Sequence, residues 1–147
     1  MRILVTGSRS WSDRDTIYRT LNDVVTEHGL WLEPDEYGNT LPSPDVVIVH
    51  GGAEGADRIA GVWAIGELLE PEVHRPDYES WPRRVAPQKR NEKMVRLGAD
   101  ICLAFILPCA LPGCRRPRPH GSHGASRCAD LAEKAGIPTR IITGGSA

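Results

Sequence analysis

Three glycine-bearing segments, each placed where a strand should pass into a helix, constrain the fold of this chain more than any other feature. They read Thr-Gly-Ser-Arg over 6–9, Gly-Gly-Ala-Glu-Gly-Ala-Asp over 51–57 and Ser-His-Gly-Ala-Ser over 122–126. The first two directly follow short apolar runs, and the third follows the apolar run 101–106 after a longer loop. Glycine permits positive φ and a close backbone approach, and the helix N-terminus just beyond attracts anions. Three such turns at one edge of a sheet predict a pocket for a phosphorylated ligand, with a nucleotide as the expected class.

Strand and helix patterns alternate along the rest of the chain. We expect strands at 2–6, 46–49, 72–75 and 101–106 and around Ile141–Ile142. The first helix should begin after a cap at Ser12 or Asp13 and stop at Gly29, and further helices are expected at 56–69, 88–97 and 125–135. This order predicts an α/β fold, a single Rossmann-like domain over 1–147 with a mostly parallel sheet of about five strands and helices on both faces. Ligands of such folds bind at the C-terminal edge of the sheet. Two irregular segments interrupt the pattern, an insert at 31–45 and a Cys/His loop at 107–123.

Size and charge exclude several classes of protein. A chain of 147 residues fits one domain, and a net charge of −1 gives no overall attraction to nucleic acid or anionic lipid. No apolar run is long enough to span a bilayer, and the N-terminus enters a strand without a signal region. We therefore expect a cytoplasmic protein with a small-molecule ligand and no membrane partner, and the net charge argues against a nucleic-acid partner.

Four motifs resemble those of the SLOG superfamily, specifically its YspA/YpsA-like branch. They are the Thr-Gly-Ser-Arg turn, the Gly-Gly-Ala-x-Gly-Ala-Asp turn, the run Lys89-Arg90-Asn91-x-x-Met94 and the Ser-x-Gly-Ala turn. The resemblance extends over about residues 1–142. It implies a Rossmann-like fold that binds nucleotides or nucleotide-derived ligands, and it implies a homo-oligomer, because SLOG proteins commonly dimerise. Trp31, on the insert, is a candidate for such an interface.

The turns and the Arg-Asn pair supply the predicted ligand-binding residues. These are Gly7, Ser8, Arg9, Gly51, Gly52, Ala53, Gly55, Asp57, Arg90, Asn91, Ser122, His123 and Gly124. Arg9 and Arg90 are expected to neutralise phosphate charge, and the amides of residues 53–55 to donate to it. Asp57 or Asn91 is expected to orient a ribose. For Asp57 the alternative is a purely structural role as a helix cap, and for the glycines a tight turn without a ligand.

An enzymatic alternative follows from the same resemblance. The Lonely Guy members of the superfamily are phosphoribohydrolases, and Arg90 falls where they use an arginine. Cys128 stands where they use a glutamate, so Glu54 or Asp57 would have to supply the carboxylate. The candidate catalytic residues are then Arg90, Glu54 and Asp57, in an N-glycosidic hydrolase acting on a nucleoside monophosphate or an ADP-ribose-type ligand. A second alternative is a DNA-associated module, because another SLOG branch assists DNA uptake.

The loop at 107–123 carries a possible zinc site. Its pattern is Cys109-x4-Cys114-x5-His120-x2-His123, which offers two thiols and two imidazoles within a short stretch. Zinc prefers four such ligands in a tetrahedron, and a metal would give order to a long loop. In the alternative interpretation, His123 donates to the ligand and the two cysteines are ordinary loop residues.

Overall fold

A five-stranded parallel sheet forms the centre of the molecule in the computed structural model, which describes residues 1–144 and leaves the last three residues of the predicted 1–147 domain outside. The strands are β1 (Arg2–Gly7), β2 (Val47–His50), β3 (Glu72–Val73), β4 (Ile101–Ile106) and β5 (Thr139–Thr143). Their order is β3-β2-β1-β4-β5, and every pairing is parallel. The predicted α/β, Rossmann-like architecture is thereby confirmed.

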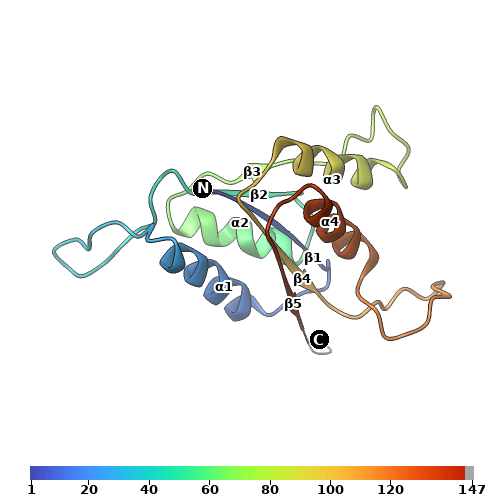
Figure 1. Ribbon diagram of the computed structural model, residues 1–147, viewed down its shortest axis with the longest axis horizontal. Coiled ribbons are helices and arrows are strands. Elements are labelled where there is room, and N and C mark those ends of the chain that lie inside the picture. The colour runs from blue at the N-terminus through green and yellow to red at the C-terminus, as the bar shows by residue number, and fades with distance from the viewer. Residues whose placement is uncertain (145–147) are drawn as a thin grey trace.

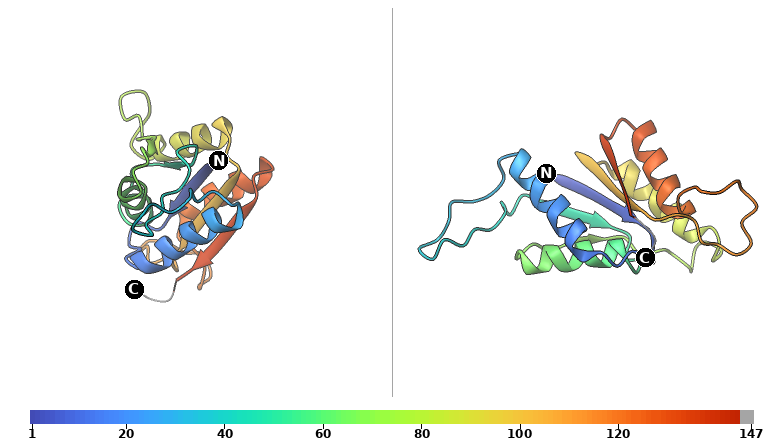
Figure 2. Two further views of the ribbon diagram at one scale, coloured as in Figure 1. Left: turned by 90° about the vertical axis from the view of Figure 1, so that its left-hand side faces the viewer. Right: turned by 90° about the horizontal axis from the view of Figure 1, so that it is seen from below.

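Two pairs of helices cover the two faces of the sheet (Figures 1 and 2). Helices α1 (Arg14–Glu27) and α2 (Ala56–Gly66) lie on one face, and α3 (Ala86–Leu97) and α4 (His123–Lys134) lie on the other. The alternation of side chains along β1 divides the core accordingly, because successive residues of a strand point to opposite faces. Ile3 and Val5 join the cluster beneath α1 and α2, whereas Leu4 packs with Met94 and Cys128 beneath α3 and α4.

Several element boundaries differ from the predicted ones. Asp13, not Ser12, caps α1, because its Oδ1 accepts the N–H of Thr16 at 3.1 Å. Helix α3 begins two residues earlier than predicted, with Pro87 in its first turn, where proline is well tolerated. Helix α4 also begins two residues early, at His123. Strand β3 has two residues in place of four, because Val73 pairs with His50, the last residue of its neighbour β2.

The strand order places the switch point of the sheet between β1 and β4. From β1 the chain builds outward through β2 and β3, and it then returns to build β4 and β5 on the other side. The carboxyl ends of the strands and the loop at 107–122 lie at one end of the molecule (Figure 1). In such sheets the crevice at the switch point is the usual place for a ligand.

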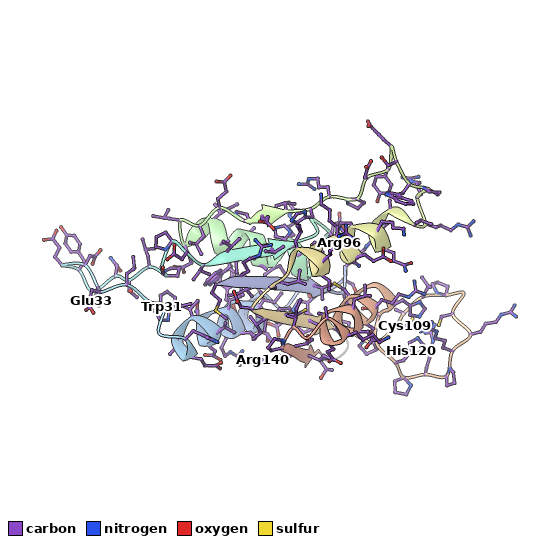
Figure 3. All side chains as sticks on the ribbon, turned by 45° about the horizontal axis from the view of Figure 1, so that its top comes forward. Trp31, Glu33, Arg96, Cys109, His120 and Arg140 are labelled. Atoms are coloured by element: carbon purple, nitrogen blue, oxygen red, sulfur yellow. The ribbon has the colours of Figure 1, made fainter. Side chains whose placement is uncertain are left out.

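The 31–45 insert projects from the opposite end of the molecule, as the labels of Trp31 and Glu33 in Figure 3 show. An isolated antiparallel bridge joins Trp31 to Pro42 at its base. The indole of Trp31 donates to Thr26 Oγ1 at 2.9 Å, so this side chain packs locally. None of the helices in the described part of the chain is long and apolar enough to cross a membrane.

Candidate functional site

A cavity of about 470 Å³ lies at the switch point between β1 and β4. Its walls are the turn after β1, the start of α3 and two segments beyond β4, Pro108–Pro112 and Ser122–Ala125. Ten of the predicted ligand-binding residues line it: Gly7, Ser8, Arg9, Ala53, Asp57, Arg90, Asn91, Ser122, His123 and Gly124. Gly51, Gly52 and Glu54 line a neighbouring cavity of about 410 Å³, which shares Arg9, Ala53 and Arg90 with the first. Gly55 lines neither.

The N-terminus of α4 faces the main cavity. Ser122 precedes the helix, but its side chain makes no capping hydrogen bond. The first amide to find an acceptor within the helix is that of Ser126, which bonds to the carbonyl of Ser122 at 3.1 Å. The amides of residues 123–125 have no intrahelical acceptor, as in the first turn of any α-helix. They therefore offer hydrogen-bond donors, and the positive end of the helix dipole, to an anion in the cavity.

Ser8 joins three segments at the floor of this cavity. Its hydroxyl accepts the N–H of Leu107 at 2.8 Å and lies 2.5 Å from the hydroxyl of Ser122. Its amide donates to the carbonyl of Phe105 at 2.9 Å. One buried serine thus connects the end of β1, the end of β4 and the start of α4.

Asp57 holds the turn between β2 and α2. Its Oδ2 accepts the amides of Gly51 at 2.9 Å and Ala53 at 3.3 Å, and the residue is 5% exposed. Burial raises the pKa of Asp57 to about 6, against the opposing effect of the two amides and of the nearby Arg90. The Ala53 amide, predicted to donate to a ligand, is therefore used within the protein. Asp57 also lines the main cavity, and it is the one carboxylate among the described residues that does so.

Arg90 is buried where the cavities meet. Its Nε donates to Asn91 Oδ1 at 2.7 Å, and its Nη1 donates to the carbonyls of Gly51 and His74. Burial lowers the pKa of the guanidinium, while Asp57 acts in the opposite direction. Nη2 has no protein acceptor among the residues that the structure describes. One edge of the guanidinium is thus anchored, and the other makes no hydrogen bond to the described residues.

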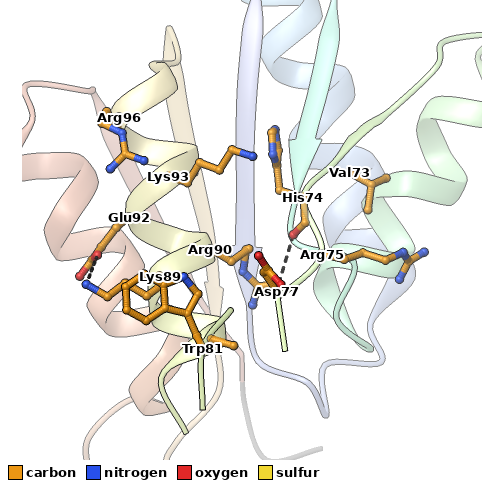
Figure 4. Close-up of a pocket in the computed structure, with 11 residues that line it drawn as sticks. Val73, His74, Arg75, Asp77, Trp81, Lys89, Arg90, Glu92, Lys93 and Arg96 are labelled. Carbon is orange, nitrogen blue, oxygen red and sulfur yellow. Dashed lines mark hydrogen bonds and ion pairs between the residues drawn. The ribbon is translucent and has the colours of Figure 1, made fainter. Parts of the chain in front are cut away.

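Arg90 also borders a third cleft, of about 420 Å³, between β3 and α3 (Figure 4). Besides Arg90, the cations lining it are Arg75, Lys89, Lys93 and Arg96, and the acidic side chains are Asp77 and Glu92. Lys89 pairs with Glu92 at 3.5 Å and lies over the ring of Trp81. No sequence pattern pointed to this cleft, whose cations outnumber its acidic side chains and give it positive potential.

Two of the predicted glycines serve the packing of the chain against itself. A Cβ on Gly55, which has φ +77°, would lie 2.3 Å from the carbonyl oxygen of Ser8. A Cβ on Gly51 would lie 2.5 Å from Arg90 Nη1. At Gly55, the missing side chain lets the backbone of the turn after β1 come close. At Gly51, it makes room for the anchored guanidinium of Arg90.

The cysteine and histidine side chains of the 107–123 loop converge on one point. Cys109 Sγ lies 3.5 Å from His123 Nε2, and Cys114 Sγ lies 3.4 Å from the Nε2 atoms of both His120 and His123. The two Nε2 atoms are 3.2 Å apart, and all four candidate ligand atoms lie within 4.8 Å of one another. Figure 3 places Cys109 and His120 together at this end of the molecule.

The three S···N separations of 3.4–3.5 Å and the N···N separation of 3.2 Å are close to those of a tetrahedral metal site. With Zn–S of about 2.3 Å and Zn–N of about 2.05 Å, a regular tetrahedron has S···N edges of about 3.6 Å and N···N edges of about 3.3 Å. The nitrogen of His120 that faces away from the cluster, Nδ1, donates to the carbonyl of Pro117 at 2.8 Å. Because a carbonyl only accepts, this bond leaves the lone pair on Nε2, as second-shell partners of zinc-binding histidines do. The predicted set Cys109, Cys114, His120 and His123 could therefore hold a metal ion.

Glu54 and Cys128, which entered the enzymatic alternative, differ in their surroundings. Glu54 is exposed and lines the neighbouring cavity, away from the main one. Cys128 is fully buried on α4, and burial raises the pKa of its thiol to about 11. The residue that the resemblance predicted to replace the Lonely Guy glutamate is thus a neutral thiol.

Sequence reasoning missed two contributors to the site. His50, at the end of β2, accepts the amide of Gly52 on its Nδ1 at 2.9 Å. Burial, and then Arg75 and Arg90, lower the pKa of His50 to about 4, so the ring is neutral and braces the turn. Pro108–Pro112 forms one wall of the main cavity. The sequence did not predict that this segment lines the cavity, because the position of a long loop depends on tertiary contacts.

Comparison with known proteins identifies the family. Residues 1–81, from β1 through β3 and into the loop beyond, match the model of the YspA, cpYpsA-related SLOG family. The chain belongs to this family. The Gene 61 protein of Mycobacterium phage D29 is 42% identical over 142 residues, which cover 93% of this SLOG chain and 92% of that protein. No solved structure matches the chain significantly. The family assignment confirms the resemblance and suggests a nucleotide-related ligand.

Proposed function

We propose that this SLOG protein binds a nucleotide or nucleotide-derived ligand in the cavity between β1 and β4. The observation that carries the proposal is the N-terminus of α4, which has no side-chain cap and whose first three residues line that cavity. A phosphate there would accept from the amides of residues 123–125 and from the hydroxyl of Ser122. Arg9 and the open edge of Arg90 would neutralise its charge.

The neighbouring cavity offers room for the rest of such a ligand. Because Arg9, Ala53 and Arg90 line both cavities, a ligand can extend from one into the other. Tyr78 lines the second cavity and is 54% exposed, so its ring offers a stacking face to a base. Asn91 Oδ1 is already bonded to Arg90, which leaves its amide group to contact a ribose.

A hydrolytic role is the second candidate, and Asp57 supports it. A carboxyl with a pKa raised to about 6 is suited to proton transfer near neutral pH, and Asp57 lines the cavity where the phosphate would bind. The remaining proposal, a DNA-associated module, rests on the superfamily alone. An affinity for single-stranded DNA that falls steeply as the salt concentration rises would support this role.

Calorimetric titration with AMP, ADP-ribose, NAD and ribose 5-phosphate tests the ligand class, with chromatography of each mixture for released base. We expect binding, and a weakening of about tenfold in Arg9→Gln, because a charge-assisted phosphate contact contributes about 1.5–3 kcal/mol. Arg14→Gln, an exposed arginine on α1 that lines neither cavity, serves as the control. Released base that disappears in Asp57→Asn, with binding retained, would make the protein a hydrolase. No binding of any of the four compounds would contradict the proposal.

We also propose that Cys109, Cys114, His120 and His123 bind zinc. Four protein ligands and no open position are typical of structural zinc sites, and two thiolates balance the charge of the ion. Metal analysis of the purified protein should give about one zinc per chain, and Cys114→Ser should lose it. Substitution with Co²⁺ should give the intense visible absorption of tetrahedral coordination. An octahedral cobalt spectrum, or zinc retained in Cys114→Ser, would contradict this assignment.

Location and assembly remain parts of the proposal. All four cysteines are free thiols, which suits the reducing cytoplasm. Light scattering on the purified chain would test the homo-oligomer that the superfamily suggests.

A further inference from the structure

The wall of the main cavity has no apolar core of its own. From residue 110 to residue 120 every side chain is exposed except those of Cys114 and His120. Both exceptions belong to the metal cluster, so the cluster is the interior of the loop. A long loop in a compact domain needs some source of order, and burial of apolar side chains does not supply it here.

Charge also works against order in this loop. Arg115, Arg116 and Arg118 lie within four residues of one another, and no Asp or Glu occurs between Asp100 and Asp130.

Backbone bonds such as Cys109 N–H to the carbonyl of His120, at 2.6 Å, close the base of the loop. Its tip is held by Arg118, which donates to the carbonyls of Cys109 and Leu111.

The cluster is continuous with the ligand cavity. Cys109 and His123 line the cavity, whereas Cys114 and His120 do not. His123 is also the first residue of α4, so a metal bound to its Nε2 holds the helix N-terminus at the point where its amides face the cavity. The same metal would hold Cys109, and with it the wall from Pro108 to Pro112.

We propose that metal binding at this cluster assembles the ligand cavity, so that the protein binds its phosphorylated ligand tightly only when zinc is bound. The proposal rests on the function proposed above for the same cavity. Zinc occupancy is then a condition for ligand binding, because the apparent affinity of a site falls with the fraction of molecules in which the site is formed. If the wall is ordered about a tenth of the time without metal, affinity falls about tenfold.

Hydrogen exchange tests the assembly step without any ligand. In the zinc-loaded protein, amides of residues 107–126 should exchange more slowly than in the zinc-free protein, while β1 and α1 should exchange alike in both. Cys114→Ser should behave as the zinc-free protein even when zinc is supplied. Gly113→Ala is the matched control, since a Cβ there meets no atom within 4 Å and the residue does not line the cavity. Equal exchange over 107–126 with and without zinc would overturn the proposal.

Titration with AMP, ADP-ribose, NAD and ribose 5-phosphate then tests the consequence for binding. Affinity should fall about tenfold in Cys114→Ser and His120→Ala, whose side chains do not line the cavity, and stay unchanged in Gly113→Ala. Equal affinity in the zinc-loaded, zinc-free and variant proteins would overturn the inference and leave the proposed function standing. If none of the compounds binds the zinc-loaded protein while its exchange still responds to zinc, the ligand class fails and the metal-dependent assembly of the wall stands.

Discussion

At the scale of single residues, Gly55 shows why the second glycine turn is constrained. Its φ of +77° disfavours any side chain, and the carbonyl of Ser8 occupies the space that a Cβ would need. Gly55→Ala should lower the free energy of unfolding by at least about 2 kcal/mol, measured by urea denaturation. Gly66→Ala, at the end of α2 with no atom within 4 Å of its Cβ, should be neutral or stabilise by up to about 1 kcal/mol. Equal effects of the two substitutions would refute this account of the turn.

Asp57 should make stability depend on pH in an unusual direction for a carboxylate. Its pKa is about 6 in the folded protein, against an ordinary value of 3.8 for an aspartate, so the protonated form favours the folded state. The resulting stabilisation is complete below the unfolded pKa and is lost as pH rises through the folded pKa. From pH 7 to pH 4, the unfolding free energy of the wild type should therefore gain about 2 kcal/mol relative to that of Asp57→Asn.

Comparing the two proteins by urea denaturation at both pH values isolates Asp57. His50, whose folded pKa is lowered, is present in both proteins and works in the opposite direction, losing stability as pH falls from 6.5 toward about 4. If wild type and Asp57→Asn differ in unfolding free energy by the same amount at pH 4 and pH 7, then folding does not disfavour the ionised form of Asp57.

At the scale of elements, the start of α4 depends on a strand that lies far away in the sequence. The hydroxyl of Ser8, at the end of β1, accepts the buried amide of Leu107 and contacts Ser122. Ser8→Ala would leave the Leu107 amide without an acceptor, at a cost of about 1–3 kcal/mol in the free energy of unfolding. Ser10→Ala, an exposed serine on the same turn, should change it by less than about 0.5 kcal/mol. Equal stabilities of the two variants by denaturant unfolding would contradict this role.

At the scale of the whole molecule, the loops that follow β1 to β4 lie at one end, and Cys109 and His120 of the candidate metal site lie there too (Figures 1 and 3). Zinc bound to the folded chain alone should stabilise it by about 4 kcal/mol when free zinc exceeds Kd 1,000-fold. The thermal midpoint should then rise by about 10 °C. Differential scanning fluorimetry with and without zinc measures this rise, and Cys114→Ser should abolish it. A rise of the same size in the variant would place the stabilising zinc elsewhere.

The fold follows from the sequence to a large extent, because apolar runs and glycine turns report local physics. Strand β4 is a continuous apolar run, and its predicted bounds are those of the structure. Helix ends were less predictable. Helix α4 starts at His123, two residues before the expected position, and Ser122 just before it contacts Ser8, which lies 114 residues away in the sequence.

The amino-acid sequence by itself determined the α/β class, the family motifs, the edge of the sheet where the turns gather and the four candidate metal ligands. Only the tertiary structure decided what those residues do there. It directed the Asp57 carboxylate to the backbone of its own turn, filled the space beside Gly51 with Arg90, and brought Cys109 and His123 to the cavity wall. The reason is physical: periodicity and turn chemistry depend on neighbours in sequence, whereas burial, charge pairing and metal geometry depend on segments that only folding brings together.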